Sequence, residues 1–215
     1  MYIFNEKDSV MLKKIFAFTL SEVLITMTII GVVAALTIPT LNYQRIKKEY
    51  STKIKNFYSK VDNAILDMEQ EQGSFKDMKK PVDGSGYDWY MKYLDPHIGH
   101  QYVKGQNIYF RDGSAIVQLY SGGCLDLVYD VNADKKPNKE GYDRFRFLFC
   151  FTPENRKSWF GNENIYWGTY GQSGTAASGA PRASALAACK ASGSACTRLL
   201  QFDNWEFKSD YPYKF

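Results

Sequence analysis

An apolar run from Phe18 to Leu41 constrains this chain more than any other feature of its sequence. From Phe18 to Ile38 the run contains one ionisable side chain, the carboxyl group of Glu22. A run of about 20 apolar residues is long enough to cross the hydrocarbon core of a bilayer as a helix. A carboxyl group inside such a helix is costly, so it is expected to have a functional partner. The run therefore predicts a membrane-spanning helix in which Glu22 serves a function.

The residues around the start of the run form a recognisable signature. Lys13 and Lys14 lead into Ile15-Phe16-Ala17, and Phe18-Thr19-Leu20-Ser21-Glu22 follows. As far as Leu41, the chain resembles the type IV prepilins and pseudopilins, which have a short basic leader, a small residue at the cut and Phe-Thr-Leu-x-Glu opening a hydrophobic helix. The resemblance implies that a prepilin peptidase cleaves between Ala17 and Phe18 and that Phe18 is N-methylated. Ala17 departs from the glycine that is usual in the family.

The resemblance also gives Glu22 a role, because the fifth mature residue is the glutamate that the family needs for assembly. Cleavage frees the α-amine of Phe18, and opposite charges in lipid are tolerated only when they are paired and hydrogen-bonded. In a stack of subunits, Glu22 of one copy can pair with the Phe18 amine of its neighbour and select an axial register. The alternative is an ordinary anchor helix in which Glu22 reaches the headgroups. Pro39 falls where the family's helix carries a proline, and a kink or local melting is expected there.

Four segments are expected along the 215 residues. Residues 1–17 are the leader, with Met11 as an alternative start, and residues 18–41 are the transmembrane and assembly helix. Residues 42–73 are the amphipathic half of the same helix, and residues 74–215 are a β-rich globular domain. The apolar stripe of the amphipathic half has helical spacing and consists of Ile46, Tyr50, Ile54, Phe57, Val61, Ile65 and Met68.

Short segments with alternating polarity predict an antiparallel sheet in the globular domain. Asp112-Gly113 lies between two of them, 107–110 and 115–120, and is a strong hairpin signal. Further strands are expected at 124–131, 144–151, 197–202 and 205–207, and a short helix at 181–190. The predicted fold class is α+β and pilin-like, with a long N-terminal membrane-spanning helix packed on an antiparallel β-sheet.

The four cysteines are an even number beside an export signal, which favours disulfides over a metal cluster. Cys189 and Cys196 are expected to close a small loop that is rich in Ala, Ser and Gly. Cys124 and Cys150 are expected to pair. If their strands are antiparallel neighbours with their apolar faces together, placing Cys124 opposite Cys150 gives a register in which the other cross-strand pairs are also favourable. The alternative is that Cys124 and Cys150 are unpaired small hydrophobic residues.

The same register makes specific predictions about cross-strand pairs. Asp130 faces Arg144, Asp126 faces Leu148, and Tyr129 faces Phe145. The first is an opposite-charge pair and the last an aromatic pair, and each kind contributes about 0.2–1 kcal/mol to a sheet. A slip of one residue would move the phenylalanines away from the buried face, so the register is expected to be strongly specified.

Oxygen side chains at alternate positions follow one of these strands. Asp130, Asn132 and Asp134 have the spacing of a calcium loop, although the glycine after Asp134 and the glutamate at the twelfth position are missing. The stretch from Asp130 to Phe145 also resembles a loop that is found in many pseudopilins, some of which hold calcium near their sheet. The alternative is a polar turn built by Asn, Asp and Pro. Calcium is therefore a tentative cofactor.

Composition and motifs narrow the function classes. The net charge of +4 is mild, so nucleic acid is not a predicted partner. The sequence has no Gly-x-Ser-x-Gly, Walker loop or His-Glu-x-x-His, and we expect no enzyme. His97 and His100 lie in one loop-like stretch and are interpreted as surface residues rather than ligands.

The resemblance implies a structural subunit, a pilin or pseudopilin, of a type IV pilus, a type II secretion system or a competence filament. Its partners would be sister subunits, prepilin peptidase and the inner-membrane assembly platform. The chain would cross the bacterial inner membrane once, keep its C-terminal domain outside the cytoplasm and then enter a filament. The alternative is a secreted or anchored ligand-binding domain that an ordinary signal peptidase releases after Val33-Ala34-Ala35, so that it starts at Leu36.

Overall fold

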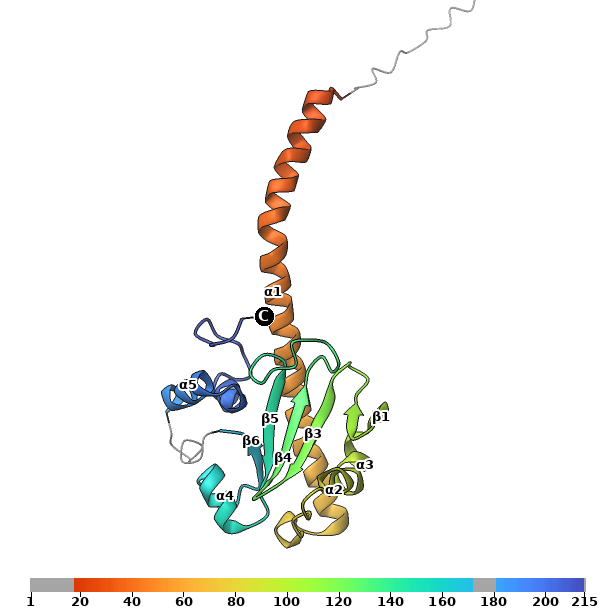
Figure 1. The fold of residues 1–215 in the computed structure, drawn as a ribbon, viewed down its shortest axis with the longest axis vertical. Helices are drawn as coiled ribbons and strands as arrows, with labels where there is room; N and C mark the ends of the chain where they lie inside the picture. The colour runs from red at the N-terminus through yellow and green to blue at the C-terminus, as the bar shows by residue number, and fades with distance from the viewer. Residues whose placement is uncertain (1–17, 172–180, 215) are drawn as a thin grey trace, which may run out of the picture. The chain divides into compact units, whose positions relative to one another are not determined.

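The computed structural model describes residues 18–171 and 181–214 (Figure 1). The chain divides into two compact units, Met1–Asn42 and Tyr43–Phe215. Helix α1 (Leu20–Gln72) begins in the first unit and ends in the second.

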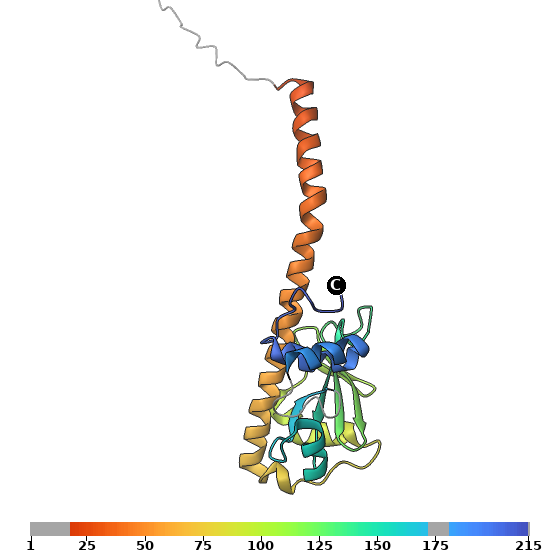
Figure 2. The ribbon, with the colours of Figure 1, turned by 90° about the vertical axis from the view of Figure 1, so that its left-hand side faces the viewer.

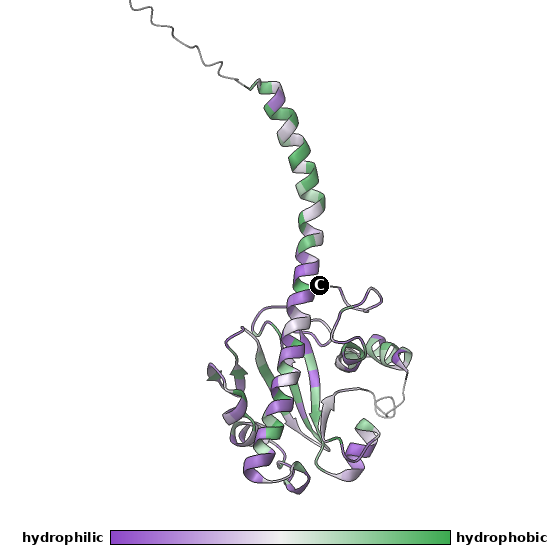
Figure 3. Cartoon of the chain, turned by 180° about the vertical axis from the view of Figure 1, so that it is seen from behind, coloured by the Kyte–Doolittle hydropathy of each residue, from purple (hydrophilic) through white to green (hydrophobic). Residues whose placement is uncertain are grey.

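In the first unit, α1 is apolar and its large side chains are exposed. Figure 3 shows that hydrophobic residues along the first part of α1 give way to hydrophilic residues further on. The hydroxyls of Thr26, Thr28 and Thr37 donate to backbone carbonyls three or four residues earlier, so these polar groups are satisfied within the helix. The helix continues through Pro39 without interruption, so of the two expected alternatives local melting does not occur, and a kink at Pro39 stays a prediction. By length and composition, α1 can cross a membrane.

In the second unit, α1 buries most of the stripe that its periodicity predicts, although Ile46 and Tyr50 at its start are only partly buried. Ile54, Phe57, Val61, Ile65 and Met68 are buried, and Ala64 joins them. The helix ends at Gln72, and the next residue, Gly73, has a φ of +90°, which only glycine adopts without strain.

The second unit also contains an antiparallel sheet that runs in simple sequence order. Within the described residues, its strands are β1 (Tyr102–Lys104), β2 (Asn107–Tyr109), β3 (Ala115–Ser121), β4 (Leu125–Asp130), β5 (Arg144–Phe149) and β6 (Trp167–Thr169). Over the same residues, the α-helices of this unit beyond α1 are α2 (Gly86–Tyr93), α3 (Asp95–Ile98), α4 (Pro153–Phe160), α5 (Arg182–Ala191) and α6 (Cys196–Phe202). The predicted α+β class with an antiparallel sheet is confirmed.

The main core lies between α1 and one face of the sheet. Figure 2 shows the second part of α1 running along that face. Phe57 of α1 stacks on Tyr129 of β4, with ring centroids 4.1 Å apart, and packs against Phe147 of β5. The phenylalanines of β5 alternate at every second residue, so all of them reach this core.

The register of β4 and β5 is the one that the sequence predicts. Asp130 pairs with Arg144, Asp126 with Leu148, and Tyr129 with Phe145. Arg144 Nε donates to Asp130 Oδ2 at 2.8 Å. Cys124 and Cys150 lie one residue beyond the paired segment and form a disulfide, with 4.4 Å between their Cα atoms. They pack with Leu148 and Phe160 on the face of the sheet opposite α1.

The secondary structure of the C-terminal residues differs from the prediction. Residues 197–202, expected to be a strand, belong to helix α6, and residues 205–207 are not a strand either. Cys196, Leu199 and Leu200 are buried at helical spacing, and the disulfide between Cys189 and Cys196 ties α6 to α5. The short strands β1 and β6 and helix α4 were not predicted, although Thr152 before Pro153 is a start signal for a helix.

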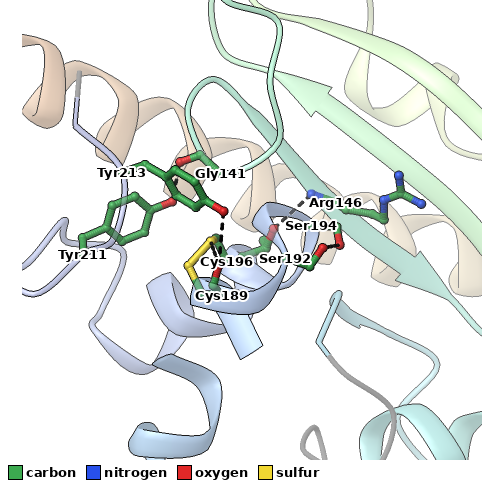
Figure 4. The surroundings of a disulfide bond; sticks show 9 residues. Gly141, Arg146, Cys189, Ser192, Ser194, Cys196, Tyr211 and Tyr213 are labelled. Atoms are coloured by element: carbon green, nitrogen blue, oxygen red, sulfur yellow. Dashed lines mark hydrogen bonds between the residues drawn. A yellow bond between two sulfur atoms is a disulfide. The ribbon is translucent and has the colours of Figure 1, made fainter. Parts of the chain in front are cut away.

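The Cys189–Cys196 disulfide holds a small loop in place (Figure 4). Near it, Tyr213 Oη donates to the carbonyl of Cys189, and Tyr211 Oη donates to the carbonyl of Gly141. The disulfide therefore lies where the C-terminal residues, α5 and the loop before β5 meet.

We expect replacement of both Cys189 and Cys196 by Ser to lower the free energy of unfolding by about 2–3 kcal/mol, because the unfolded chain loses a short cross-link. The measurement is chemical denaturation of the full chain in detergent, followed by tryptophan fluorescence. Ser192→Ala, an exposed change within the same loop, is the matched control. Equal stability of the double variant and the control would show that the cross-link adds nothing.

Candidate assembly site at the start of the long helix

The first residues of α1 form a capping box. The backbone N–H and the Oγ1 hydroxyl of Thr19 both donate to Glu22 Oε2 at 2.8 Å. In return, the backbone N–H of Glu22 donates to Thr19 Oγ1 at 3.2 Å. This reciprocal pattern satisfies donors that the start of a helix otherwise leaves unpaired. It fixes the start of the helix at Leu20 and orients the Glu22 carboxylate.

The capping box occupies one oxygen of Glu22. Among the residues that the structure describes, none donates a hydrogen bond to the other oxygen, Oε1. Phe18, which would carry the α-amine after cleavage, is 83% exposed. The site therefore presents a carboxylate oxygen about one helical turn from the expected mature N-terminus.

Sequence reasoning found Glu22 but missed Thr19. The signal was present, because Thr19-x-x-Glu22 directly before an apolar run is the capping-box pattern. Ala17, the expected leader side of the cut, lies outside the described residues. The site is followed by apolar side chains that are exposed in the chain by itself, such as Leu20 at 79% and Leu36 at 72%. Such a surface requires lipid or other apolar partners to cover it.

The predicted calcium ligands lie in the loop between β4 and β5. Asp130 binds Arg144, whereas Asp134 accepts a hydrogen bond from Tyr109 Oη at 2.9 Å. The side-chain amide of Asn132 lies 2.9 Å from the hydroxyl of Tyr50 on α1. The three side chains thus contact different partners. Burial raises the pKa of Asp130 to about 6, and the hydrogen bond from Arg144 acts in the opposite direction.

A residue that the sequence did not single out organises this loop. Asp143 is fully buried, and its carboxylate accepts backbone N–H groups of Asn138 at 2.9 Å and Lys139 at 2.7 Å. Across residues 18–171 and 181–214, no group of three His, Cys, Asp or Glu side chains is placed to hold a metal ion. The loop has the geometry of a polar turn, and calcium stays a prediction that this geometry does not support.

The two histidines do not form a site with each other. His100 Nδ1 lies 2.8 Å from Asp95 Oδ1, and His97 Nε2 lies 3.7 Å from Glu71 Oε2. The His97 side chain is only 9% exposed, so its interpretation as a surface residue is wrong.

Most of the chain matches one family by sequence. Residues 40–215 match a family of unknown function, DUF6613. The chain belongs to DUF6613. The match spans the sheet, both disulfides and the second part of α1, so these features lie in the DUF6613 part of the chain.

The segment before the DUF6613 match has a second assignment. Residues 12–38 match the prokaryotic N-terminal methylation motif, which confirms the resemblance to type IV prepilins. The motif marks this DUF6613 protein as a type IV pilin-like or pseudopilin-like substrate of prepilin peptidase, and proteins of that kind are structural. It includes Thr19 and Glu22, the two residues of the capping box. No curated protein and no solved structure matches the chain.

Proposed function

We propose that this DUF6613 protein is a structural subunit, a minor pilin or pseudopilin, of a type IV pilus, type II secretion or competence filament. The observation that carries the proposal is the capping box of Thr19 and Glu22 inside the methylation motif, at the head of an exposed apolar helix. A carboxylate held at that place has a geometry suited to pairing with an amine in lipid.

The chain would be processed, held in the membrane and then assembled. Prepilin peptidase cleaves between Ala17 and Phe18, and Phe18 is methylated on its new amine. Residues 18–41 hold the chain in the inner membrane as a single span, while residues 42–73 continue the helix and residues 74–215 fold outside the cytoplasm. Two disulfides support this location, because disulfides persist in oxidising compartments. The assembly platform then brings sister subunits together.

Assembly rests on the chemistry of Glu22. Its Oε2 oxygen is oriented by Thr19, and its Oε1 oxygen is available to the Phe18 amine of a neighbouring subunit. In hydrocarbon, an unpaired charge of either sign is costly, so the pair favours an axial register in which both charges are satisfied.

The test is the N-terminus of the mature protein. Sequencing and intact mass should give a chain that begins with methylated Phe18. A chain that begins at Leu36 would instead support the secreted binding domain, since an ordinary signal peptidase would then have acted after Ala35. The match to the methylation motif favours the first outcome.

We expect Ala17→Glu to block processing, because a charged side chain would replace the small residue at the cut. The chain should accumulate as the precursor, which is heavier by residues 1–17, on intact mass. Ala17→Gly is the matched control, and it should be processed at least as well as the native chain because glycine is usual at this place. Normal maturation of Ala17→Glu would place the cut elsewhere.

A further inference from the structure

A groove lies between α1 and the residues that lead into β6. It has a volume of about 420 Å³, and its lining includes Tyr58, Asp62 and Leu66 of α1 together with Ile165, Tyr166 and Trp167. Because all of them belong to the second unit, the groove is a feature of the globular domain. It plays no part in the capping box at the start of α1.

One wall of the groove combines a carboxylate with aromatic rings. Asp62 is half-buried and forms no ion pair with any residue that the structure describes. Trp167 is 6% exposed, and none of the described residues accepts a hydrogen bond of normal length and angle from its buried indole Nε1. The rings of Tyr58 and Trp167 stack with centroids 5.5 Å apart. Burial raises the pKa of Asp62, and the nearby indole N–H acts in the opposite direction.

The rim of the groove is apolar and open. Leu66 is 57% exposed and Ile165 is 41% exposed, although most large hydrophobic residues of this unit are buried. A carboxylate beside aromatic faces binds a cationic side chain, because the charge is paired while the apolar stem lies on the rings. The apolar rim would then be covered by the surface that carries the cation.

The same helix carries suitable cations. Residues 45–60 of α1 contain six Lys or Arg residues and one acid, Glu49, whereas residues 61–72 contain four acids and no Lys or Arg. Lys48 and Lys55 are exposed and form no ion pair within the described residues. Lys48, Lys55 and Asp62 are spaced by seven residues, so they lie on one face of the helix.

We propose that this groove is a socket for Lys48 or Lys55 of a second copy of the chain. Within one helix, residues seven apart are separated by about 10 Å along the axis, too far for the pairing that occurs three or four residues apart. The pairing is therefore between copies, and because its two sides are different surfaces it repeats along a filament instead of closing a dimer. This inference rests on the proposed function and selects among its forms, because it requires a pilin or pseudopilin whose copies are neighbours in the filament and not a minor subunit that is isolated from other copies.

A cross-link between copies tests the inference directly. Full-length Leu66→Cys is expressed in its native bacterium and treated with a short thiol-to-amine cross-linker. We expect a covalent dimer of this chain, with position 66 joined to Lys48 or Lys55 on peptide mapping. The matched control adds Lys48→Arg and Lys55→Arg, which keep both charges but remove both amines; the dimer should disappear while assembly persists. A link from position 66 to a different protein, or a dimer that survives in the control, overturns the inference.

Charge reversal tests the energetics of the same contact. Asp62→Lys should reduce incorporation into filaments at least about tenfold, because a desolvated charge then lacks its partner. Lys48→Glu with Lys55→Glu should do the same, and the three changes together should restore assembly. Asp67→Lys, an exposed acid outside the groove, is the control that should assemble normally. Thermal unfolding in detergent must show that each variant is folded.

The outcomes separate this inference from the proposed function. If Asp62→Lys assembles normally while Glu22→Gln does not, the socket is wrong and the filament role stands. If the lysine changes weaken membrane association and Asp62→Lys has no effect, the basic face binds anionic lipid and the socket is again wrong. Rescue by the triple change together with the cross-link supports the socket.

Discussion

We expect Glu22→Gln to leave export, cleavage and folding intact and to abolish incorporation of the chain into filaments. The change removes the charge that would pair with the Phe18 amine of a neighbour, and in lipid that amine would be left unpaired. Glu22→Ala should have the same effect. The measurement is the amount of mature chain in sheared filaments or cross-linked assemblies relative to the membrane fraction.

The capping box makes it possible to separate charge from helix capping. Gln is also found at this position of a capping box, so Glu22→Gln can keep the hydrogen bond from the Thr19 N–H while losing the charge. Thr19→Ala does the reverse, because it removes the hydroxyl that bonds Glu22 but keeps the carboxylate. We expect Thr19→Ala to assemble better than Glu22→Gln.

Two results would contradict the pairing. If Glu22→Gln enters filaments at the native level, the charge has no role in assembly. If Thr19→Ala and Glu22→Gln fail equally, the helix cap is sufficient to explain the effect. In either case, N-terminal sequencing would still report whether cleavage after Ala17 had taken place.

We expect Gly193→Ala to destabilise the globular domain more than any other change to a single small side chain in its disulfide loop. A Cβ atom at Gly193 would lie 2.2 Å from the carbonyl oxygen of Glu140 and 2.6 Å from its carbonyl carbon. Both are backbone atoms, and two hydrogen bonds hold the next residue, Gly141, in place. The Gly141 N–H donates to the backbone carbonyl of Arg144, and the Gly141 carbonyl accepts from Tyr211 Oη. Figure 4 shows Gly141 and Tyr211 beside the disulfide.

The clash should lower the free energy of unfolding by at least the amount that is usual for overpacking, about 1–3 kcal/mol, because backbone atoms have to move to make room for the new methyl group. Chemical denaturation of the full chain in detergent measures it. Ser194→Ala, next to Gly193 in the loop, should stay within about 0.5 kcal/mol of the native chain, as surface changes usually do. If both variants unfold at the same denaturant concentration, the close contact between Gly193 and Glu140 does not hold the loop.

Sequence alone determined the features that depend on local periodicity or on a single exceptional residue. The apolar run predicted the first part of the long helix, which the structure confirms. The one acid in the run made Glu22 the candidate assembly residue, because a carboxylate in hydrocarbon is costly, and that role stays a prediction. The register of β4 and β5 came from placing Cys124 opposite Cys150, and strict alternation in β5 supported it, since a slip of one residue would expose the face that has to be buried. The structure confirms both the register and the disulfide.

Only the tertiary structure decided features that join short segments from distant parts of the chain. Residues 196–202 form a helix because their disulfide and buried leucines pack against other elements. A segment of seven residues has only a weak helical preference of its own, so packing decides its structure. Asp143 organises its loop because the backbone N–H groups of Asn138 and Lys139 both donate to its buried side chain. Asp62 and Trp167 line one groove although more than a hundred residues separate them in the chain. No periodicity in either segment encodes that arrangement, which exists because α1 and β6 pack together, as the stacking of Tyr58 on Trp167 shows.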